Sequence, residues 1–512
     1  MLDYRTHQIS TEQILNAGRA AHSRRVHRNR SNLQLGLPAS ELEFLNAWLV
    51  GDLVLPGDRN YDADRQLFNR RFDPRPSAIV HCKVERDVRL CLGALRSHKT
   101  QFRIRAGGNC FAGYSASDGV IIDVSGLDDV FVDPETLVAT VGAGCRFGKL
   151  QAILDDHELH LPLGDAKNVS IGGFMQGGGF GLTSRTYGMN CDHVLEARIM
   201  LADGRVVLAN EKVNHDLWWA IRGGTGGNFG VLLTVRYRLH PAPEQNRWCL
   251  GWRLSRGADL EQAISALMTL QESVVVHGSP PEMNVSATVV HIADRPQAAP
   301  QTPWLLMWGT YVGSETRMDA WLDPLLRNPG CWPRFQPEFG IRRRRKFERL
   351  SRLVSRGLRP ADWRSILSHF LTKAPNRQSM LQVDVWGGAI GRHPRETSAF
   401  IHRDAAFNIA LTAWWQTEKE QRKSRSFLSS WADLVTPLGN GRIYQNFPSA
   451  DAPNYQENYW GAALPALAAV KRKYDPAGLF DFPQVIPSGG LKAVKWPPSV
   501  VKSLKEPIAI GP

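Results

Sequence analysis

Seven glycines fall within eighteen consecutive positions of this chain, in the stretch 164–181 (GDAKNVSIGGFMQGGGFG). Glycine reaches positive φ angles without steric cost and lets the backbone approach a ligand closely, so such a run is typical of a ligand-binding loop. Consecutive backbone N–H groups in a loop of this kind form a concavity that can hold a diphosphate. Flexible linkers rarely place Ile171, Phe174 and Phe180 between their glycines, so the pattern favours a binding loop over a linker.

Two further glycine clusters occur at 105–113 (RAGGNCFAG) and 222–230 (RGGTGGNFG). The spacing at 164–181 matches neither the G-x-G-x-x-G pattern of Rossmann dinucleotide sites nor a Walker loop. Three separated glycine loops indicate a large cofactor that lies between two domains. The histidines show no metal-ligand spacing and no G-x-S-x-G elbow occurs, so we expect no metal and no serine nucleophile. The polar groups that remain are tyrosine, aspartate and tryptophan, which fits a site where the cofactor performs the chemistry.

The elements that must position these loops are short strands and amphipathic helices. Before residue 240 the sequence predicts a helix at 86–98 and strands at 78–84, 102–105, 119–124 and 137–141. After residue 248, predicted helices at 259–274 and 315–326 alternate with predicted strands at 286–292, 304–310, 381–386 and 408–414. This order predicts an α+β fold whose second domain contains a mostly antiparallel sheet.

The composition bounds the class of protein. With 43% apolar and 22% charged residues, the 512-residue chain resembles an ordinary soluble protein of two or more domains. No 18-residue apolar run and no secretory segment occur, and the seven cysteines form no C-x-x-C pair, so we expect a cytoplasmic protein without a membrane partner. The net charge of +13 is concentrated at 19–30 and 342–346. No nucleic-acid-binding motif adjoins these runs, so we expect solvated basic surface, with an acidic ligand or partner as the alternative.

Five stretches in a set order carry a family resemblance: RAGGNCFAG, GDAKNVSIGGFMQGGGFG, DLWWAIRGGTGGNFGV, YQNF and NYWGAALPALAAVKRKYDPAGLF. Over about residues 74–487 the chain resembles the berberine-bridge-enzyme-like FAD-linked oxidases of the vanillyl-alcohol oxidase / p-cresol methylhydroxylase (PCMH) superfamily. The resemblance implies an α+β protein with a PCMH-type FAD-binding domain in two chain segments and an inserted antiparallel-sheet substrate domain. The implied boundaries are a basic arm at 1–60, the FAD-binding domain at 61–245, the substrate domain at 246–440 and a segment completing the FAD module at 441–512.

The expected cofactor is therefore FAD, with its diphosphate on the first two glycine loops and its isoalloxazine ring at the domain interface. The residues that the motifs and the resemblance assign to FAD binding are Arg105, Gly107, Gly108, Asn109, Cys110, Gly164, Val169, Ser170, Gly172, Gly173, Gly177, Gly181, Gly226, Gly227, Phe229, Gly230, Val231 and Asn446.

Two departures from the family pattern concern how FAD is held. Members often attach FAD through a histidine in R-x-G-G-H and a cysteine in G-x-C-x-x-V-G. This chain has Asn109 at the histidine position and Ala166 at the cysteine position. Neither an amide nor a methyl group can form the bond, so we expect non-covalent FAD. Cys110 is one residue further on and is a weak alternative anchor.

The resemblance also assigns residues near the reacting atoms. Val169 matches the family's oxygen gate, where valine resembles the oxidases and leucine the dehydrogenases; the alternative is that it is simply a core residue. Tyr444 in YQNF matches the Tyr-x-Asn motif, so we expect it to act as the general base or to share that role. Asp384 in VDVWGG is expected to accept the phenolic proton, directly or through water. The acidic or amide residue that other members use is replaced near Ala410, and the second tyrosine of the tail motif is Phe447.

The sequence therefore predicts an FAD-dependent oxidoreductase, with a small-molecule substrate and O2 as partners. We expect an oxidase that passes hydride from an alcohol or similar C–H donor, a sugar or a natural product, to flavin N5, with reoxidation by O2 giving H2O2. A flavin-dependent tailoring enzyme that dehydrogenates or cyclises a natural product is one alternative. A non-catalytic FAD-binding protein is the other. Trp386, Trp414 and Trp415 could stack on a sugar or an aromatic ring equally well, and the oligomeric state is left open.

Overall fold

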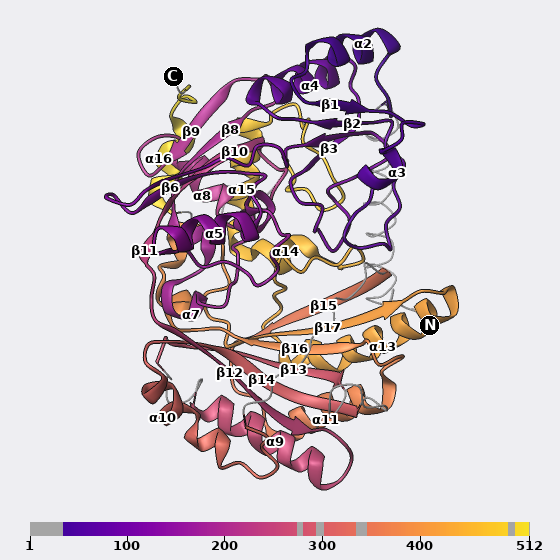
Figure 1. The fold of residues 1–512 in the computed structure, drawn as a ribbon. Helices are drawn as coiled ribbons and strands as arrows, with labels where there is room; N and C mark the ends of the chain where they lie inside the picture. The colour runs from indigo at the N-terminus through magenta and orange to yellow at the C-terminus, as the bar shows by residue number, and fades with distance from the viewer. Residues whose placement is uncertain (1–33, 274–279, 293–301, 334–345, 490–496, 511–512) are drawn as a thin grey trace, which may run out of the picture.

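The computed structural model describes residues 34–273, 280–292, 302–333, 346–489 and 497–510, and the basic runs at 19–30 and 342–345 lie outside them. Two parts stand one above the other in Figure 1. The upper part contains the N-terminal and C-terminal portions of the described chain, and the lower part contains the middle portion. Within the described residues, no helix combines the length and the apolarity needed to span a bilayer.

The first sheet of the upper part has four strands in the order β1-β2-β4-β3: Asp52–Val54, Ala78–His81, Val120–Asp123 and Phe102–Arg105. β4 pairs in parallel with both of its neighbours, whereas β1 pairs antiparallel with β2. Helix α4 (Glu85–Ser97) covers this sheet because Val88, Leu92 and Leu95 recur at helical spacing and are fully buried. Helix α2 (Ala39–Trp48) and β1 both fall within the range predicted as a basic arm.

The second sheet of the upper part is antiparallel, with five strands in the order β5-β6-β10-β8-β9: Val130–Asp133, Val138–Gly142, Val231–Arg238, Val194–Met200 and Val206–Asn210. Short elements flank it, namely α5 (Phe147–Asp156), α6 (Ile171–Gln176), α7 (Ser184–Tyr187), α8 (His215–Ile221) and the strand pair β7 (Leu159–His160) and β11 (His240–Pro241). The short helix α3 (Tyr61–Asp64) packs through Tyr61 against the first sheet instead. The glycine loops lie between these elements.

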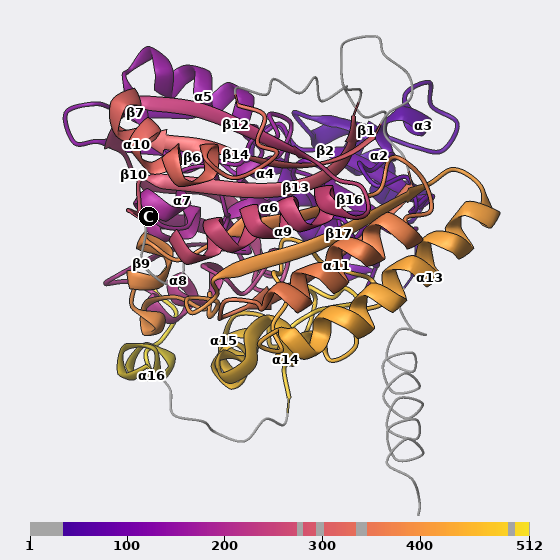
Figure 2. The ribbon, with the colours of Figure 1, turned by 90° about the horizontal axis from the view of Figure 1, so that it is seen from below.

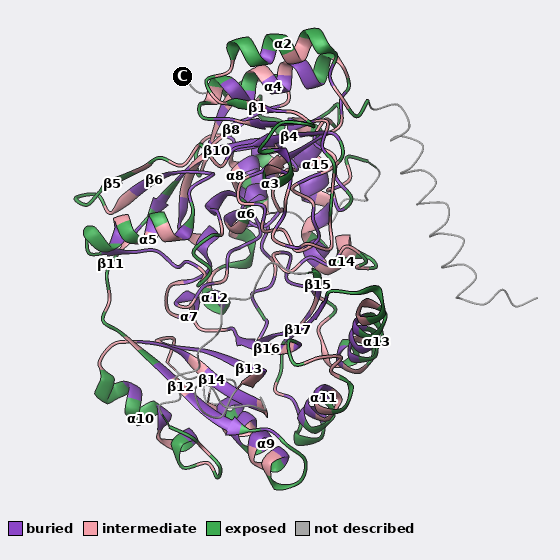
Figure 3. Cartoon of the chain, turned by 45° about the vertical axis from the view of Figure 1, so that its right-hand side comes forward, coloured by how far each residue is buried: buried purple, intermediate pink, exposed green. Residues whose placement is uncertain are grey.

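The lower part is built on one antiparallel sheet of six strands in the order β12-β14-β13-β16-β17-β15: Gln245–Arg253, Thr302–Val312, Met283–Ile292, Met380–Val385, Phe407–Trp415 and Lys346–Val354. Four helices lie across one face of this sheet (Figure 2): α9 (Ala258–Gln271), α10 (Glu315–Leu326), α11 (Pro360–Lys373) and α13 (Glu418–Val435). Their apolar residues share one buried core with the sheet, while their outer sides are exposed (Figure 3). The opposite face of the sheet is directed toward the upper part.

The C-terminal segment returns to the upper part. Helices α15 (Leu464–Tyr474) and α16 (Pro498–Lys505) lie beside α8, and α14 (Tyr455–Trp460) packs against α15. These helices are drawn in yellow tones in Figure 1. One core joins residues of α8, α14 and α15. The predicted fold class is confirmed: an α+β protein in which two chain segments form one module around an inserted antiparallel-sheet domain. The domain boundaries stay predictions.

Candidate active site

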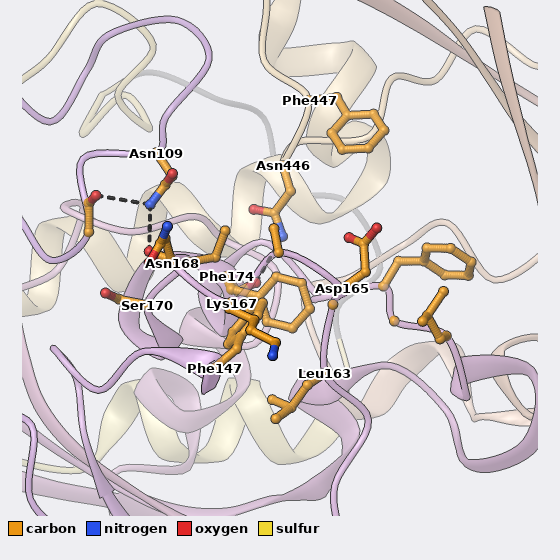
Figure 4. A pocket seen from close by; sticks show the side chains of 18 of the residues that line it. Asn109, Phe147, Leu163, Asp165, Lys167, Asn168, Ser170, Phe174, Asn446 and Phe447 are labelled. Atoms are coloured by element: carbon orange, nitrogen blue, oxygen red, sulfur yellow. Dashed lines mark hydrogen bonds between the residues drawn. The ribbon is translucent and has the colours of Figure 1, made fainter. Parts of the chain in front are cut away.

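A cavity of about 2530 Å³ is lined by the glycine loops of the upper part and the open face of the six-stranded sheet, and it extends past β12 to helix α10. Pockets for drug-sized ligands are usually about 300–1,000 Å³, so this cavity has room for a dinucleotide together with a substrate. Figure 4 shows side chains of the upper part that line it, among them Asn109 and Ser170 of the glycine loops and Phe447 of the tail.

Most of the residues predicted for the site line this cavity. From the first two glycine loops these are Gly107, Gly108, Asn109, Cys110, Gly164, Val169, Ser170, Gly172, Gly173 and Gly181, and from the third loop Gly226, Gly227 and Gly230. Asn446, Tyr444 and Asp384 line it as well. Chain segments more than 300 residues apart therefore meet here.

Four predicted residues do not line the cavity. The guanidinium of Arg105 donates to the Asp123 carboxylate (2.5 Å) and to the backbone, and so supports its loop from behind. Phe229 and Val231 are buried in the apolar core. Gly177 makes room for Asn446, because a Cβ atom at this position would lie 2.1 Å from the Asn446 amide oxygen.

The first two glycine loops are joined by the side chain of Asn109. Its Nδ2 atom donates to the carbonyl oxygens of Gly107 (2.9 Å) and Asn168 (3.0 Å), the contacts dashed in Figure 4. A Cβ atom added to Gly173 meets no protein atom within 4 Å, so the backbone there borders open space. Gly108 has a φ of +67°, a conformation that glycine adopts without strain.

Three buried polar atoms beside these loops have no hydrogen-bond partner among the described residues: Tyr114 Oη, Ser115 Oγ and Ser170 Oγ. All three side chains line the cavity. A buried polar atom without a partner is costly, so these atoms indicate a polar ligand. Together with the bare backbone at Gly173, they fit the phosphates and sugar hydroxyls of FAD.

A buried lysine holds the third glycine loop against the tail. Lys471 Nζ donates to the carbonyl oxygens of Asn228 (2.6 Å) and Phe480 (2.7 Å) and to the Asp475 carboxylate (2.6 Å). The Asp475 carboxylate also accepts the N–H groups of Leu479 and Phe480. Because residues 226–230 and 480–484 both supply cavity walls, this ion pair sets the distance between them. This ion pair was not predicted from the sequence, although a basic and an acidic residue four apart at the end of a helix are a recognisable signal.

The positions expected to carry covalent links hold Asn109 and Ala166, and both line the cavity. Burial raises the pKa of the Cys110 thiol, which lowers the thiolate population that a covalent bond to flavin requires. Val169 is partly buried, packs against the main core and lines the cavity, so the interpretation as an oxygen gate and the interpretation as a core residue both fit its location.

Asp384 lies on the open face of the six-stranded sheet and receives three hydrogen bonds. Ser286 Oγ (2.8 Å) and Gln382 Nε2 (2.7 Å) donate to Oδ1, and Asn408 Nδ2 (3.2 Å) donates to Oδ2. Burial raises the pKa of this carboxyl, and the donors and the Arg349 charge act against that rise. A carboxylate has about four acceptor sites, so one site remains for a proton.

Tyr444 is placed differently. Its hydroxyl oxygen accepts the backbone N–H of Phe180 (2.8 Å) and Nδ2 of Asn446 (3.1 Å), and the ring meets Trp386 edge-on. Burial raises the pKa of the phenol well above its ordinary value, so the phenol is protonated at neutral pH. Among the described residues no hydrogen bond joins Tyr444 to Asp384, so the expected direct proton transfer between them has no path in this structure.

An aromatic wall and a basic side chain stand next to Asp384. Phe447 stacks on Phe111 (5.6 Å between centroids), and the Arg349 guanidinium lies 4.5 Å from the Phe447 ring centroid. Trp414 lines the cavity beside Phe347. Trp386 packs on Phe180 instead, and Trp415 is buried, so only one of the three tryptophans lines the cavity.

Gln382 and Arg349 were not found from the sequence. Gln382 could have been, because strand alternation places it on the same face as Asp384 two residues later. Arg349 could not, because only strand pairing brings β15 alongside β17. Ala410 on β17 is paired with Gln382 on β16. The amide of Gln382 therefore lies beside position 410, where the family resemblance leads us to expect an acidic or amide residue.

Comparison with known proteins gives matches over both halves of the upper part. The FAD binding domain family matches residues 76–210, and the berberine and berberine like family matches residues 443–487. Uncharacterized FAD-linked oxidoreductase YvdP of Bacillus subtilis is 29% identical over 457 residues, covering 86% of this chain and 98% of the relative. Xylooligosaccharide oxidase of Thermothelomyces thermophilus is 25% identical, covering 83% and 90%. The structure of Physcomitrella patens BBE-like 1 superposes with a TM-score of 0.77 at 25% identity, covering 88% of this chain and all of that one.

Proposed function

We propose that this chain, an FAD-dependent oxidoreductase similar to the berberine-bridge-enzyme-like FAD-linked oxidases, oxidises an alcohol or similar C–H donor with O2 as acceptor. The observation that carries this proposal is that one continuous cavity is lined both by the glycine loops and by Asp384. One end offers bare backbone and unpartnered hydroxyls to a dinucleotide, and the other offers a carboxylate and aromatic rings to a substrate.

Bound FAD supplies a hydride acceptor that O2 reoxidises with formation of H2O2. The loops around Gly107, Gly173 and Gly226 would hold the cofactor, and the hydroxyls of Ser115 and Ser170 would donate hydrogen bonds to its polar atoms. We propose that this binding is non-covalent, since Asn109 and Ala166 stand at the linking positions. Val169 leaves space beside the cofactor for O2.

The proton of the substrate hydroxyl goes to Asp384. Its carboxyl has a pKa raised by burial, so it is a stronger base than an exposed aspartate, and one acceptor site is available. A protonated Tyr444 cannot accept a proton, so it is better suited to position the Phe180 backbone and Asn446 beside the cofactor. The motif-based prediction that Tyr444 itself is the general base is an alternative to this assignment.

The substrate class is proposed from the lining of the sheet face. Ser286, Thr288, Gln382 and Thr412 offer hydrogen bonds, while Phe111, Phe447 and Trp414 offer faces for stacking. This combination suits a sugar, whose hydroxyls need polar partners and whose C–H face packs on aromatic rings. Two relatives are named for oligosaccharide oxidation, which supports the same class. A bulky natural product is the second candidate, favoured by the cavity volume.

Anaerobic rapid mixing of the FAD-loaded protein with xylobiose, chitobiose and coniferyl alcohol tests the proposal. We expect at least one of these probes to bleach the flavin absorbance, and air to restore it with release of H2O2. If none of these sugars or alcohols bleaches the flavin absorbance of the FAD-loaded protein, the result would support the alternative of a non-catalytic FAD-binding protein.

A further inference from the structure

A row of hydrogen-bonded side chains crosses three strands of the six-stranded sheet and ends on Asp384. Arg349 on β15 donates from Nε to Thr412 Oγ1 (2.8 Å) and from its second terminal nitrogen to Gln382 Oε1 (3.0 Å). Gln382 Nε2 in turn donates to Asp384 Oδ1 at 2.7 Å. The row therefore connects a permanent positive charge to the carboxylate through one amide group.

The chemistry of the three groups defines the direction of this row. A guanidinium can only donate hydrogen bonds, so the amide oxygen of Gln382 must face Arg349 and the amide nitrogen must face Asp384. A positive charge at the amide oxygen polarises the amide and strengthens the hydrogen bond that its nitrogen donates. The effect of Arg349 thus reaches Asp384 both through space and through the amide.

The row depends on a small residue on the intervening strand. Ala410 on β17 is paired with Gln382 on one side and with Ser351 on the other. It lies on the same face as Thr412, two residues along the strand. Arg349 is paired with Thr412 and Gln382 with Ala410, so the hydrogen bond between Arg349 and Gln382 runs diagonally past position 410, where a longer side chain would crowd it. The small residue at 410, where the family resemblance leads us to expect an acidic or amide side chain, therefore leaves room for the hydrogen bond between Arg349 and Gln382.

We propose that Arg349, acting through the Gln382 amide across the small Ala410, is a positioning residue that keeps the Asp384 carboxylate ionised and holds it in one orientation. This inference rests on the proposed function, in which Asp384 takes the substrate proton. Asp384 can accept that proton only while its carboxylate is ionised. By lowering the pKa of Asp384, the row keeps the carboxylate ionised, and the enzyme active, at lower pH.

The other groups around Asp384 do not duplicate this role. Within the described part of the chain, β13 presents Ser286 and Thr288 to the same region and β17 presents Asn408 and Thr412, none of which carries a charge. The tail contributes the Tyr444 phenol, which is neutral at working pH. The Arg349 charge acts on this carboxyl and lowers its pKa.

Infrared spectroscopy of the FAD-loaded protein tests the inference without any substrate. The carbonyl stretch of protonated Asp384 is identified as the band lost in Asp384→Asn, and its intensity is titrated against pH. Losing a donor or a nearby positive charge raises a carboxyl pKa, so the midpoint should move to higher pH in Arg349→Met, Gln382→Met and Ala410→Leu. A charge-assisted hydrogen bond corresponds to a shift of about one pH unit. Arg352→Met removes the same charge from the same strand, but outside the cavity lining, and should leave the midpoint unchanged.

Circular dichroism and flavin absorbance confirm that each variant is folded and loaded. Gln382→Met removes no charge and one buried polar group, so it remains informative if Arg349→Met fails to fold. Midpoints of Gln382→Met and Ala410→Leu equal to that of the wild type would overturn the inference. A shifted midpoint combined with an Asp384→Asn variant that still bleaches its flavin at the wild-type rate would preserve the inference and overturn the assignment of the base.

Discussion

Nδ2 of Asn109 donates a hydrogen bond to the carbonyl oxygen of Asn168 at 3.0 Å and so ties the first glycine loop to the second. Position 109 is where the family resemblance leads us to expect a histidine bonded to the flavin; in this chain the amide of Asn109 connects two loops of the protein. The hydrogen bond holds the two loops together within the protein itself.

We therefore expect FAD to be released completely when the protein is denatured. Acid precipitation should leave all flavin in the supernatant, and Cys110→Ser should behave identically because burial disfavours the Cys110 thiolate. Intact mass of the denatured chain provides the check. A mass increase equal to one FAD, lost in Cys110→Ser, would show that this cysteine is the anchor.

Reoxidation by O2 should depend on the side chain at position 169. Val169→Leu adds one methylene group at the cavity wall and should slow the return of flavin absorbance on mixing with air at least tenfold. The anaerobic rate of bleaching should change much less, and this internal comparison separates access of O2 from damage to the site. Equal reoxidation rates in the two proteins would assign Val169 to the core alone.

The two candidates for the base differ in their expected pH dependence. Asp384→Asn should lower the rate of flavin bleaching by about 10²–10⁴. In the wild type the rate should fall as pH drops through the pKa of Asp384, which burial places above the ordinary aspartate range, because only the ionised carboxylate accepts a proton. Tyr444→Phe keeps the ring and removes the hydroxyl that Phe180 and Asn446 contact.

If Tyr444 only positions its neighbours, Tyr444→Phe should retain the acidic limb of the pH profile and lose less activity than Asp384→Asn. If it is the base, as the motif alone predicts, bleaching should fall at least a hundredfold while FAD binding survives. Stopped-flow traces of both variants between pH 5 and 9, with the bleaching probe found above, distinguish these outcomes.

The ion pair of Lys471 and Asp475 should be needed for both stability and FAD affinity. Lys471→Met leaves a buried carboxylate without its partner, and such losses cost about 3–5 kcal/mol. The thermal unfolding midpoint should fall, and FAD should bind more weakly because the walls at 226–230 and 480–484 are no longer held together. Lys423→Met removes an exposed lysine from α13 and serves as the control for charge. An unchanged FAD affinity in Lys471→Met would restrict the pair to a folding role.

Features that depend on neighbouring residues in the sequence were predicted well, whereas features that depend on contacts between distant segments were not. Strands such as 78–81 and 407–415 were predicted within a few residues, because alternation and turn residues are local signals. The glycine loops were predicted as the cofactor site because glycine runs report backbone requirements directly. Arg105 was assigned to the cofactor because it adjoins Gly107, yet its guanidinium pairs with Asp123 on the neighbouring strand.

The catalytic region was less accessible to sequence reasoning. Tyr444 and Asp384 were both placed in the cavity, but the direction of a side chain depends on packing that no motif encodes. The hydroxyl of Tyr444 faces the Phe180 backbone, and the neighbours of Asp384 come from β13, β16 and β17. Such contacts follow from strand order, which the sequence did not provide.

The central claim is that the cavity between the glycine loops and the sheet holds FAD, and Gly173→Val tests it most directly. The new side chain would occupy the open space that the Gly173 backbone borders, where the cofactor is proposed to lie. Gly93→Val also enters open space, on α4 outside the cavity, and controls for the loss of a glycine. Titration with FAD, followed by quenching of its fluorescence, should show one site per chain in the wild type and in Gly93→Val and none in Gly173→Val, with unchanged far-UV dichroism in all three. A wild-type protein that takes up no FAD, or a Gly173→Val variant that binds it as tightly as the wild type, would contradict the account.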